Sequence, residues 1–464
     1  MEAGLFRFLR FSLGLEGEAK GLLDGRKGSF DWDACYQFAK RQTLVGVLFD
    51  GIQRLPKELA PARPLLLRWL SDSESIRRRN MRIDRASAYI YNKVCAAGFR
   101  CCILKGQGNA LLYPHPSSRT PGDVDVWVMA NREELRHIAL SLTEGDGSSL
   151  QESLNHIGLT VHGVSMELHS TPALLNSPLH NSRLQKWLKR NADLQCSNRI
   201  ALPNNAGEVA VPTLSFNIIY QLCHLFHHCF YEGVGLRQIV DYFFVLKNTD
   251  FSGNTNGASG NTDCFSGNTD EDGVLSNTDF TDNTDRIGGN AESDGSLMNT
   301  DCTDFTDSSS GDFEGDGCLL NTDCADFLDS SSGGLGEVDS GGALVALQEE
   351  LKWLGLGEFA GAVMYVLREV MGLDEKRMIC APDERRGRLL LEEIMAGGNF
   401  GHYDTRNHFG QGALWHNIQR FRRDWRMLRF YPSEALSEPL FRAWHFLWRW
   451  KQKHIGMPKE RNLN

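Results

Sequence analysis

The sequence predicts an α+β protein in which a small mixed sheet is flanked by helical regions on both sides. Three observations predict this fold. Apolar residues recur at helical spacing near both ends, short alternating segments lie between them, and one long stretch consists largely of Asn, Thr, Asp, Ser and Gly. The expected parts are an N-terminal helical region at 1–97, a sheet core at 98–200, a C-terminal helical domain at 201–247 and 343–464, and a disordered acidic insertion at 248–342.

The length of the chain and its cysteines indicate the number of domains and the cellular compartment. A chain of 464 residues is long enough for two or three domains. Its 12 cysteines form no C-x-x-C pair, which is typical of reduced thiols in the cytoplasm rather than of a disulfide framework or a zinc site. Glu2 stands where a signal peptide carries positive charge, and no apolar run approaches the roughly 20 residues of a membrane span. We expect a cytoplasmic protein without a membrane segment.

The N-terminal region predicts helices followed by the first strand. Residues 73–97 show apolar positions at helical spacing with arginines on the other side, which predicts one long helix. Gly98 ends it, and residues 99–104 predict a short buried strand. A helical turn is expected at 109–113, before a proline-rich loop.

The remaining strands are predicted by the alternation of apolar and polar residues. Residues 123–129 predict a strand, and residues 132–142 a helix. Residues 159–169 predict a hairpin with its turn at His162 and Gly163. Strands mixed with helices over this interval indicate a small α/β unit inside the larger chain.

The second half is helical apart from the insertion. Residues 212–246 and the segment from 343 onward show helical patterning. Between them, 248–342 carries 21 Asp or Glu against the single Arg286, a net charge of −20, and repeats Asn-Thr-Asp seven times. Such a segment cannot bury enough apolar surface to offset the entropy of ordering it. The rest of the chain carries +10, which suits a polyanionic ligand but is common in ordinary enzymes.

Acidic side chains gather on one face of the predicted sheet. In a strand over 123–129, the valines point to the core, while Asp123, Asp125 and Trp127 share the other face. On the second hairpin strand, Glu167 also lies on the face opposite the apolar residues. Two carboxylates about 4 Å apart repel by about 4 kcal/mol at an effective dielectric of 20, and a divalent cation between them relieves this repulsion. A solvated strand edge is the alternative interpretation.

A glycine turn stands between the first strand and the following helical turn. Lys105 and Gly106 lie at this junction, where backbone N–H groups favour phosphate. A simple tight turn remains the alternative.

Three further features leave alternatives open. His224, His227 and His228 on one helix suit buried or capping positions better than a metal site. Arg237 and Asp241 are four residues apart and suit a helical ion pair that braces the domain, with direct binding of the acceptor as the alternative. The C-terminal helices interleave arginines with aromatic residues, which fits either stacking on nucleic acid or, as we prefer, packing on the body.

The motifs together resemble the polymerase-β nucleotidyltransferase superfamily, and within it the bacterial family of uncharacterised nucleotidyltransferases. More distantly, the chain is similar to the nucleotidyltransferase toxins of abortive-infection systems. The residues that carry the resemblance are Leu104-Lys-Gly, Leu112-Tyr, Arg119, Gly122-Asp-Val-Asp and Glu167-Leu-His, with Gly233-Val-Gly-Leu-Arg-Gln-Ile-Val-Asp and Gly397-Gly-Asn-Phe-Gly as further blocks.

The resemblance implies roles for individual residues. Asp123 and Asp125 would bind Mg²⁺ or Mn²⁺, and Glu167 would be a third metal ligand that also helps to activate the acceptor. Lys105 and Gly106 would form the phosphate-side turn; the chain departs from many superfamily members here, because Gln107 replaces a serine after the glycine.

The implied activity is transfer of an NMP from an NTP, such as ATP, to an acceptor hydroxyl with release of pyrophosphate. Arg119 would steady the phosphates of the nucleotide. The acceptor could be a protein, a tRNA, a sugar or a small molecule. The alternative is a non-catalytic NTP-binding protein or a regulatory protein of the toxin–antitoxin type that keeps the fold.

Overall fold

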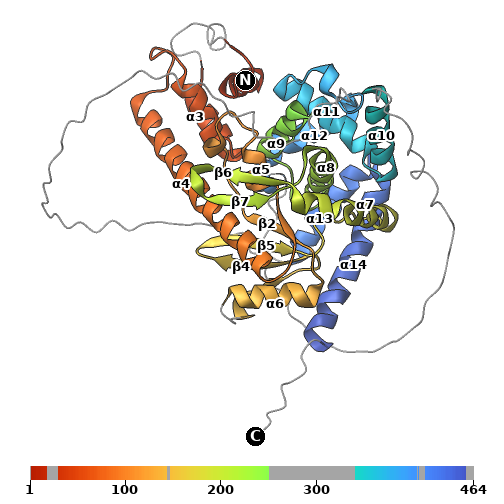
Figure 1. Ribbon diagram of the computed structural model, residues 1–464. Helices are drawn as coiled ribbons and strands as arrows, with labels where there is room; N and C mark the ends of the chain where they lie inside the picture. Colours follow the sequence, from red (N-terminus) through yellow and green to blue (C-terminus); the bar gives the residue numbers. More distant parts are fainter. Residues whose placement is uncertain are drawn as a thin grey trace, which may run out of the picture.

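The computed structural model describes residues 2–17, 30–143, 147–249, 340–404, 406 and 413–455. Within them, helices surround a five-stranded sheet, which confirms the expected α+β class (Figure 1). Buried apolar side chains form one cluster across sheet and helices. The insertion expected at 248–342 lies outside the described residues except at its two ends. Among the described residues, no helix combines the length and apolar character that crossing a bilayer requires.

The helices before the sheet are α1 (Glu2–Ser12), α2 (Trp32–Arg41), α3 (Val45–Gln53) and α4 (Arg63–Ala96). Asp31 caps α2, since its carboxylate accepts a hydrogen bond from the N–H of Ala34. The long helix α4 starts earlier than the predicted 73–97, with Pro64 in its first turn, where a missing N–H costs nothing. It ends before Gly98, whose φ of +86° only glycine adopts readily. This helix runs diagonally beside the sheet and contacts β1, β2 and β5 (Figure 1).

The sheet consists of β1 (Cys101–Leu104), β2 (Val124–Val128), β3 (Gln151–Glu152), β4 (His156–Val161) and β5 (Val164–His169), in the spatial order β1-β2-β5-β4-β3. Strands β2 and β5 run parallel and the other neighbours antiparallel, so the sheet is mixed, as expected. His162 and Gly163, both at positive φ, form the predicted turn between β4 and β5. Helix α6 (Arg132–Leu142) follows β2, in agreement with the prediction.

The two faces of the sheet have different neighbours. Cys101 lies opposite Val128, and its Sγ is 4.0 Å from the carbonyl oxygen of Tyr91 on α4, so the apolar face packs on this helix. On the other face, Trp127 is buried and stacks on Phe216 of α8, with ring centroids 5.8 Å apart. The polar face is therefore partly covered by the helical domain.

The elements after the sheet are α7 (Pro178–Ser197), β6 (Arg199–Leu202), β7 (Gly207–Ala210), α8 (Leu214–Tyr231), α9 (Leu236–Asn248), α10 (Ser340–Trp353), α11 (Gly357–Met371), α12 (Glu384–Gly397), α13 (Ala413–Leu428) and α14 (Pro432–Ile455). Short 3₁₀ helices lie at Pro116–Ser118, Gly147–Ser149, Pro203–Asn205, Glu375–Arg377 and Asn399–Gly401. The sequence did not predict α7 or the β6–β7 hairpin. The helical segment at 212–246 is two helices, because Gly233 takes a φ of +119° and lies against the backbone of Gly401.

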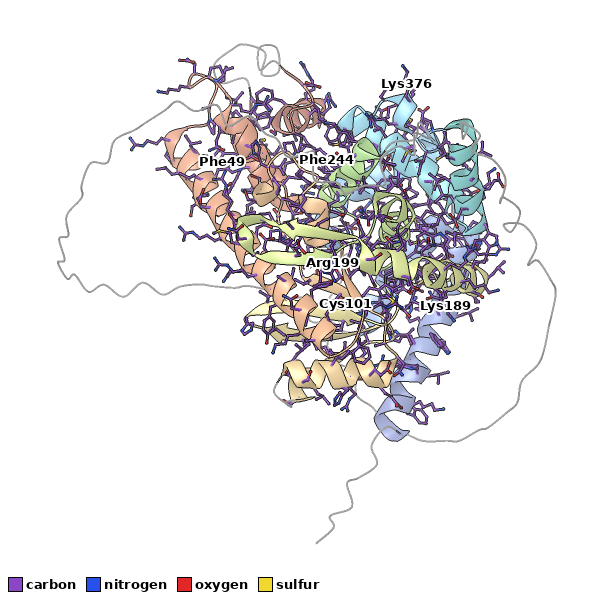
Figure 2. The ribbon with its side chains drawn as sticks, in the orientation of Figure 1. Phe49, Cys101, Lys189, Arg199, Phe244 and Lys376 are labelled. Carbon is purple, nitrogen blue, oxygen red and sulfur yellow. The ribbon has the colours of Figure 1, made fainter. Side chains whose placement is uncertain are left out.

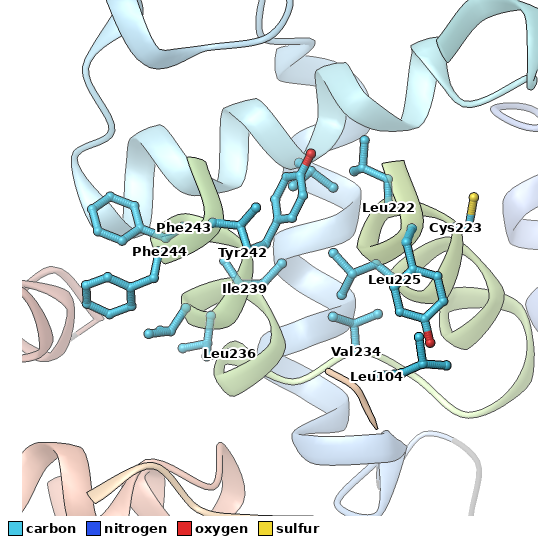
Figure 3. Packing of buried hydrophobic residues seen from close by; sticks show 14 of the residues in the cluster. Leu104, Leu222, Cys223, Leu225, Val234, Leu236, Ile239, Tyr242, Phe243 and Phe244 are labelled. Carbon is cyan, nitrogen blue, oxygen red and sulfur yellow. The ribbon is translucent and has the colours of Figure 1, made fainter. Parts of the chain in front are cut away.

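The end of β1 is anchored in the helical domain. Leu104, the last residue of β1, shares one buried cluster with Leu225 of α8 and Ile239 of α9 (Figure 3). Cys101 and Phe244, which are labelled in Figure 2, are buried, with exposed fractions of 1% and 2%. This packing fixes the backbone directly before Lys105.

Candidate active site

Three carboxylates converge at one place on the sheet. Asp125 of β2 lies opposite Glu167 of the parallel strand β5, and Asp123 directly precedes β2. One carboxylate oxygen of each residue lies within 4.8 Å of the other two. Asp125 is buried, Glu167 is half-buried and Asp123 is exposed, so the group opens to solvent at Asp123. The structure thus brings together the three acids that the sequence indicated.

The charges of this group are unevenly compensated. Loss of hydration, together with repulsion from Asp125 and Glu167, raises the pKa of Asp123 to about 6, although the side chain keeps contact with solvent. Burial alone would raise the pKa of Asp125, but Lys105 and His169 lower it below its usual range. Burial would likewise raise the pKa of Glu167, and the hydrogen bond with His169 lowers it. An all-oxygen donor set with excess negative charge fits Mg²⁺.

Lys105 supplies a fixed positive charge beside Asp125. Its Nζ lies 2.9 Å from Oδ2 of Asp125; burial alone would lower the pKa of Lys105, but the carboxylates raise it. Lys105 and Gly106 take φ values of +50° and +41°, so the chain turns sharply after β1. For lysine such a backbone conformation costs about 1–3 kcal/mol.

The helix that follows this turn is α5 (Gly106–Ala110), which begins earlier than the helical turn expected at 109–113. It has only 5 residues, and this length gives little helix dipole. The expected phosphate contact therefore depends on Lys105 and the N–H groups of the turn.

Two histidines lie beside the carboxylates on the same face of the sheet. Nε2 of His169 is 3.0 Å from Oδ1 of Asp125 and 3.2 Å from Oε2 of Glu167, and Nε2 of His156 is 3.6 Å from Oε1 of Glu167. Burial would lower the pKa of His169, but its hydrogen bonds with both carboxylates raise it to about 9. Burial lowers the pKa of His156 to about 4. Sequence reasoning gave neither residue a role, although alternation along β5 places His169 on the face of Glu167.

Arg119, which was predicted to steady the phosphates, is engaged with α9. Its side chain is 3% exposed, and its Nε and Nη2 each donate to a different carboxylate oxygen of Asp241 at 2.7 Å. The hydroxyl of Tyr113 donates to the same carboxylate at 2.7 Å. Arg237, expected to pair with Asp241, donates to the carbonyl oxygen of Thr120 at 3.1 Å. Arg119 thus connects the loop before β2 to the helical domain.

The loop that carries Arg119 also contacts two helices of the N-terminal region, α3 and α4. Nδ2 of Asn80 on α4 donates to the carbonyl oxygens of Ser117 and Arg119, at 2.9 Å each. Gly46 of α3 packs so close that a Cβ there would lie 2.3 Å from the carbonyl oxygen of Ser118. These contacts fix the approach of the chain to Asp123.

A row of side chains leads from Lys105 along α8. Nε2 of His224 lies 3.3 Å from Nζ of Lys105 and 2.9 Å from Nε2 of His228, whose Nδ1 lies 3.1 Å from the carboxylate of Glu232. Burial and the charge of Lys105 hold the pKa of His224 well below its usual range. The sequence indicated buried or capping histidines and missed this contact with Lys105, because only the spacing of His224 and His228 was visible.

The aromatic residues of the C-terminal helices are packed only in part. Phe430 packs against the core, and Trp448 lies 4.5 Å from the guanidinium of Arg132. Trp425 and Trp444, however, are 67% and 51% exposed. The interpretation that these aromatic residues pack on the body is therefore wrong for the latter two.

Comparison with known proteins finds one family that matches this part of the chain. A family model described as "uncharacterised nucleotidyltransferase" matches residues 28–256, the interval that contains all of the candidate residues in and around the sheet. An antigenic nucleotidyltransferase-like protein from Paracoccidioides brasiliensis is 16% identical and aligns over 35% of this chain and 75% of its own, with a TM-score of 0.24, which is too low to support an argument. No curated protein matches. The family match supports placing the chain in a nucleotidyltransferase family.

Proposed function

We propose that this chain is a divalent-metal-dependent nucleotidyltransferase that moves an NMP from an NTP to an acceptor hydroxyl and releases pyrophosphate. The convergence of Asp123, Asp125 and Glu167 beside Lys105 carries the proposal. These three carboxylates would hold Mg²⁺ or Mn²⁺, which when bound polarises the transferred phosphoryl group and neutralises its charge. The family match over residues 28–256 supports the same reaction class.

The reaction forms one bond and breaks one. The acceptor oxygen bonds to the α-phosphorus, the bond from that phosphorus to the bridging oxygen breaks, and pyrophosphate leaves with the electron pair. Glu167, whose pKa lies below its usual range and which is therefore ionised at neutral pH, takes the proton of the acceptor and passes it to solvent.

The remaining residues position the phosphates and the loop. Lys105 lies between Asp125 and His224 and presents its charge to the phosphate oxygens. Arg119 acts on this site as a positioning residue, since its bond to Asp241 fixes the loop that leads to Asp123.

The test uses the full-length chain with Mg²⁺, each NTP labelled at the α-phosphorus, and a cell extract as the source of acceptor. The labelled species then identifies the acceptor as protein, tRNA, sugar or small molecule. Wild type should label one class of acceptor and release pyrophosphate, and Asp123→Asn should do neither. The matched control is Asp193→Asn, which removes a carboxylate from an exposed pair with Arg100 and should behave as wild type.

Two results would count against the proposal. Undiminished labelling by Asp123→Asn would remove the carboxylate group from the reaction. Binding of an NTP by the wild type without pyrophosphate release, in the presence of every acceptor fraction, would favour a non-catalytic nucleotide-binding protein.

A further inference from the structure

A second group of metal-binding side chains lies next to the carboxylates. It consists of His156 on β4 and of Glu167 and His169 on β5, with one ligand atom of each within 4.8 Å of the others. His156 lies directly opposite His169 in the antiparallel pair, and Glu167 precedes His169 by two residues. Residues two apart on a strand share a face, and cross-strand partners do so as well. The sheet itself therefore directs all three side chains to one point.

The two separations between the imidazoles and the carboxylate fit a single ion, and the two imidazoles lie within 4.8 Å of each other. Nε2 of His169 lies 3.2 Å from Oε2 of Glu167, and Nε2 of His156 lies 3.6 Å from Oε1 of the same carboxylate. Zinc binds imidazole nitrogen and carboxylate oxygen at about 2.0–2.2 Å, so two ligand atoms of one ion lie at most about 4.4 Å apart. Both separations are within this limit.

The ligand set differs from that of the neighbouring carboxylates. Asp123, Asp125 and Glu167 offer only oxygen, the donor that Mg²⁺ prefers. Two imidazoles and a carboxylate suit Mn²⁺, Fe²⁺ or Zn²⁺ instead. We propose that His156, Glu167 and His169 form a second divalent-cation site, which selects a transition metal over Mg²⁺.

The surroundings indicate reversible binding at this site. His169 also contacts Oδ1 of Asp125 at 3.0 Å, a contact that an ion on Nε2 would replace. The Nδ1 atoms of His156 and His169 are buried and, among the described residues, have no hydrogen-bond partner. Such outer partners commonly strengthen metal sites about 10–100-fold, so their absence predicts an exchangeable ion rather than a permanent structural one.

The shared ligand gives the site a consequence for catalysis. Glu167 belongs to both groups, so an ion bound to the imidazoles competes with Mg²⁺ for its carboxylate. Zn²⁺ or Fe²⁺ should therefore inhibit Mg²⁺-supported transfer. Only this consequence rests on the proposed function; the metal site is tested by binding alone.

The experiment adds Mn²⁺ alone to the full chain and measures by pulsed electron paramagnetic resonance whether the ion couples to ¹⁴N of imidazole. Mn²⁺ is the suitable probe because thiolates, which this chain carries on 12 cysteines, are poor ligands for it. Wild type should show Mn²⁺ coupled to nitrogen. His156→Gln should bind this ion at least about tenfold more weakly and with fewer coupled nitrogens. His162→Gln, an exposed histidine at the turn of the same hairpin, is the matched control and should behave as wild type.

Two further variants separate the possible failures. His156→Asp restores a metal ligand that carries no nitrogen. This variant should regain affinity for Mn²⁺ but show fewer coupled nitrogens than wild type. Such a result would show that the weaker Mn²⁺ binding of His156→Gln is not caused by misfolding. Asp123→Asn, outside this group, should lose transfer and keep the nitrogen coupling. Wild type with nitrogen coupling and no transfer would overturn the proposed function and leave this site standing. Absence of coupling in wild type, or unchanged coupling in His156→Gln, would overturn the site.

Discussion

Two groups of buried charge lie near the loop that leads to Asp123, and they are built differently. In the first, Asp241 accepts two hydrogen bonds of 2.7 Å from Arg119 and a third from Tyr113. Both carboxylate oxygens have fixed partners within the chain. We call this group balanced because its carboxylate is fully paired, although Nη1 of Arg119 is buried without a hydrogen-bond partner among the described residues.

In the second group, three carboxylates share few cations. Lys105 and His169 both contact Asp125, and among the described residues no salt bridge includes Asp123. Loss of hydration, followed by repulsion from Asp125 and Glu167, raises the pKa of Asp123 to about 6. The difference teaches that burial of charge alone does not mark a functional site: a fully paired charge braces the fold, whereas carboxylates held together favour binding of a cation, which we propose here to be Mg²⁺.

The largest expected effect belongs to the unbalanced group. Asp125→Asn should lower the rate of pyrophosphate release roughly a thousandfold, because a bound metal supplies several kcal/mol of transition-state charge stabilisation. Initial rates at saturating Mg²⁺ and NTP measure it. The surface variant Asp193→Asn should keep the wild-type rate, and a fast Asp125→Asn enzyme would mean that this carboxylate does not hold the metal.

The balanced group should show its effect in stability instead. Asp241→Asn leaves the buried guanidinium of Arg119 without its counter-charge, and breaking such a pair from one side costs about 3–5 kcal/mol. Urea unfolding followed by circular dichroism measures the change. Asp193→Asn breaks a pair whose side chains are 62% and 77% exposed and should cost less than about 1 kcal/mol. Equal losses in the two variants would contradict the distinction.

Asp84 is an intermediate case, a buried carboxylate with one neutral partner. Burial raises its pKa to about 6, although the hydrogen bond that Gln107 donates lowers it. The folded protein then binds a proton that the unfolded chain has released, so this residue destabilises the fold as pH rises from about 4 to above 6. Asp84→Asn should be more stable than wild type at pH 8 by up to about 2–3 kcal/mol, and not at pH 4. Unfolding free energies at both pH values test this, and a pH-independent difference would refute it.

The smallest expected effect is a change in the melting temperature of Asp123→Asn, which should gain stability while it loses activity. Asp123→Asn removes repulsion from Asp125 and Glu167, so without Mg²⁺ it should melt slightly above wild type at pH 8, where Asp123 is ionised. The advantage should shrink at pH 5, below the pKa of about 6, and should reverse when Mg²⁺ is added. Thermal unfolding under the three conditions measures it. A variant that melts below wild type without Mg²⁺ would show that the repulsion is already relieved.

Local patterns predicted β1, β2, β4 and β5 and the face of each acid, but not β3, β6 or β7. Alternation over 123–129 and the turn at His162 and Gly163 sufficed, because side-chain direction in a strand has a period of two. The register that sets Asp125 opposite Glu167 is a parallel pairing of two strands that are separated in sequence by α6, β3 and β4, and no local pattern encodes it.

Long-range partners explain what the sequence could not predict. Arg119 has the chemistry of a phosphate ligand, and no pattern in the sequence indicated that its Nε and Nη2 donate to Asp241, 122 residues later. His224 contacts Lys105 over a separation of 119 residues. Helical periodicity predicts that His224 and His228 lie on the same face of α8, but it does not predict which residues contact that face.

The proposed metal site at Asp123, Asp125 and Glu167 is tested most directly by melting temperature. The measurement is the rise in melting temperature that Mg²⁺ causes in wild type, in Asp241→Asn and in Asp125→Asn. A ligand that binds only the folded state stabilises it by about 2.7 kcal/mol at 100 times its dissociation constant. We predict a clear rise in wild type, a rise in Asp241→Asn that is no larger because the loop before Asp123 is less well fixed, and no rise in Asp125→Asn. A rise in Asp125→Asn as large as in wild type would contradict the account.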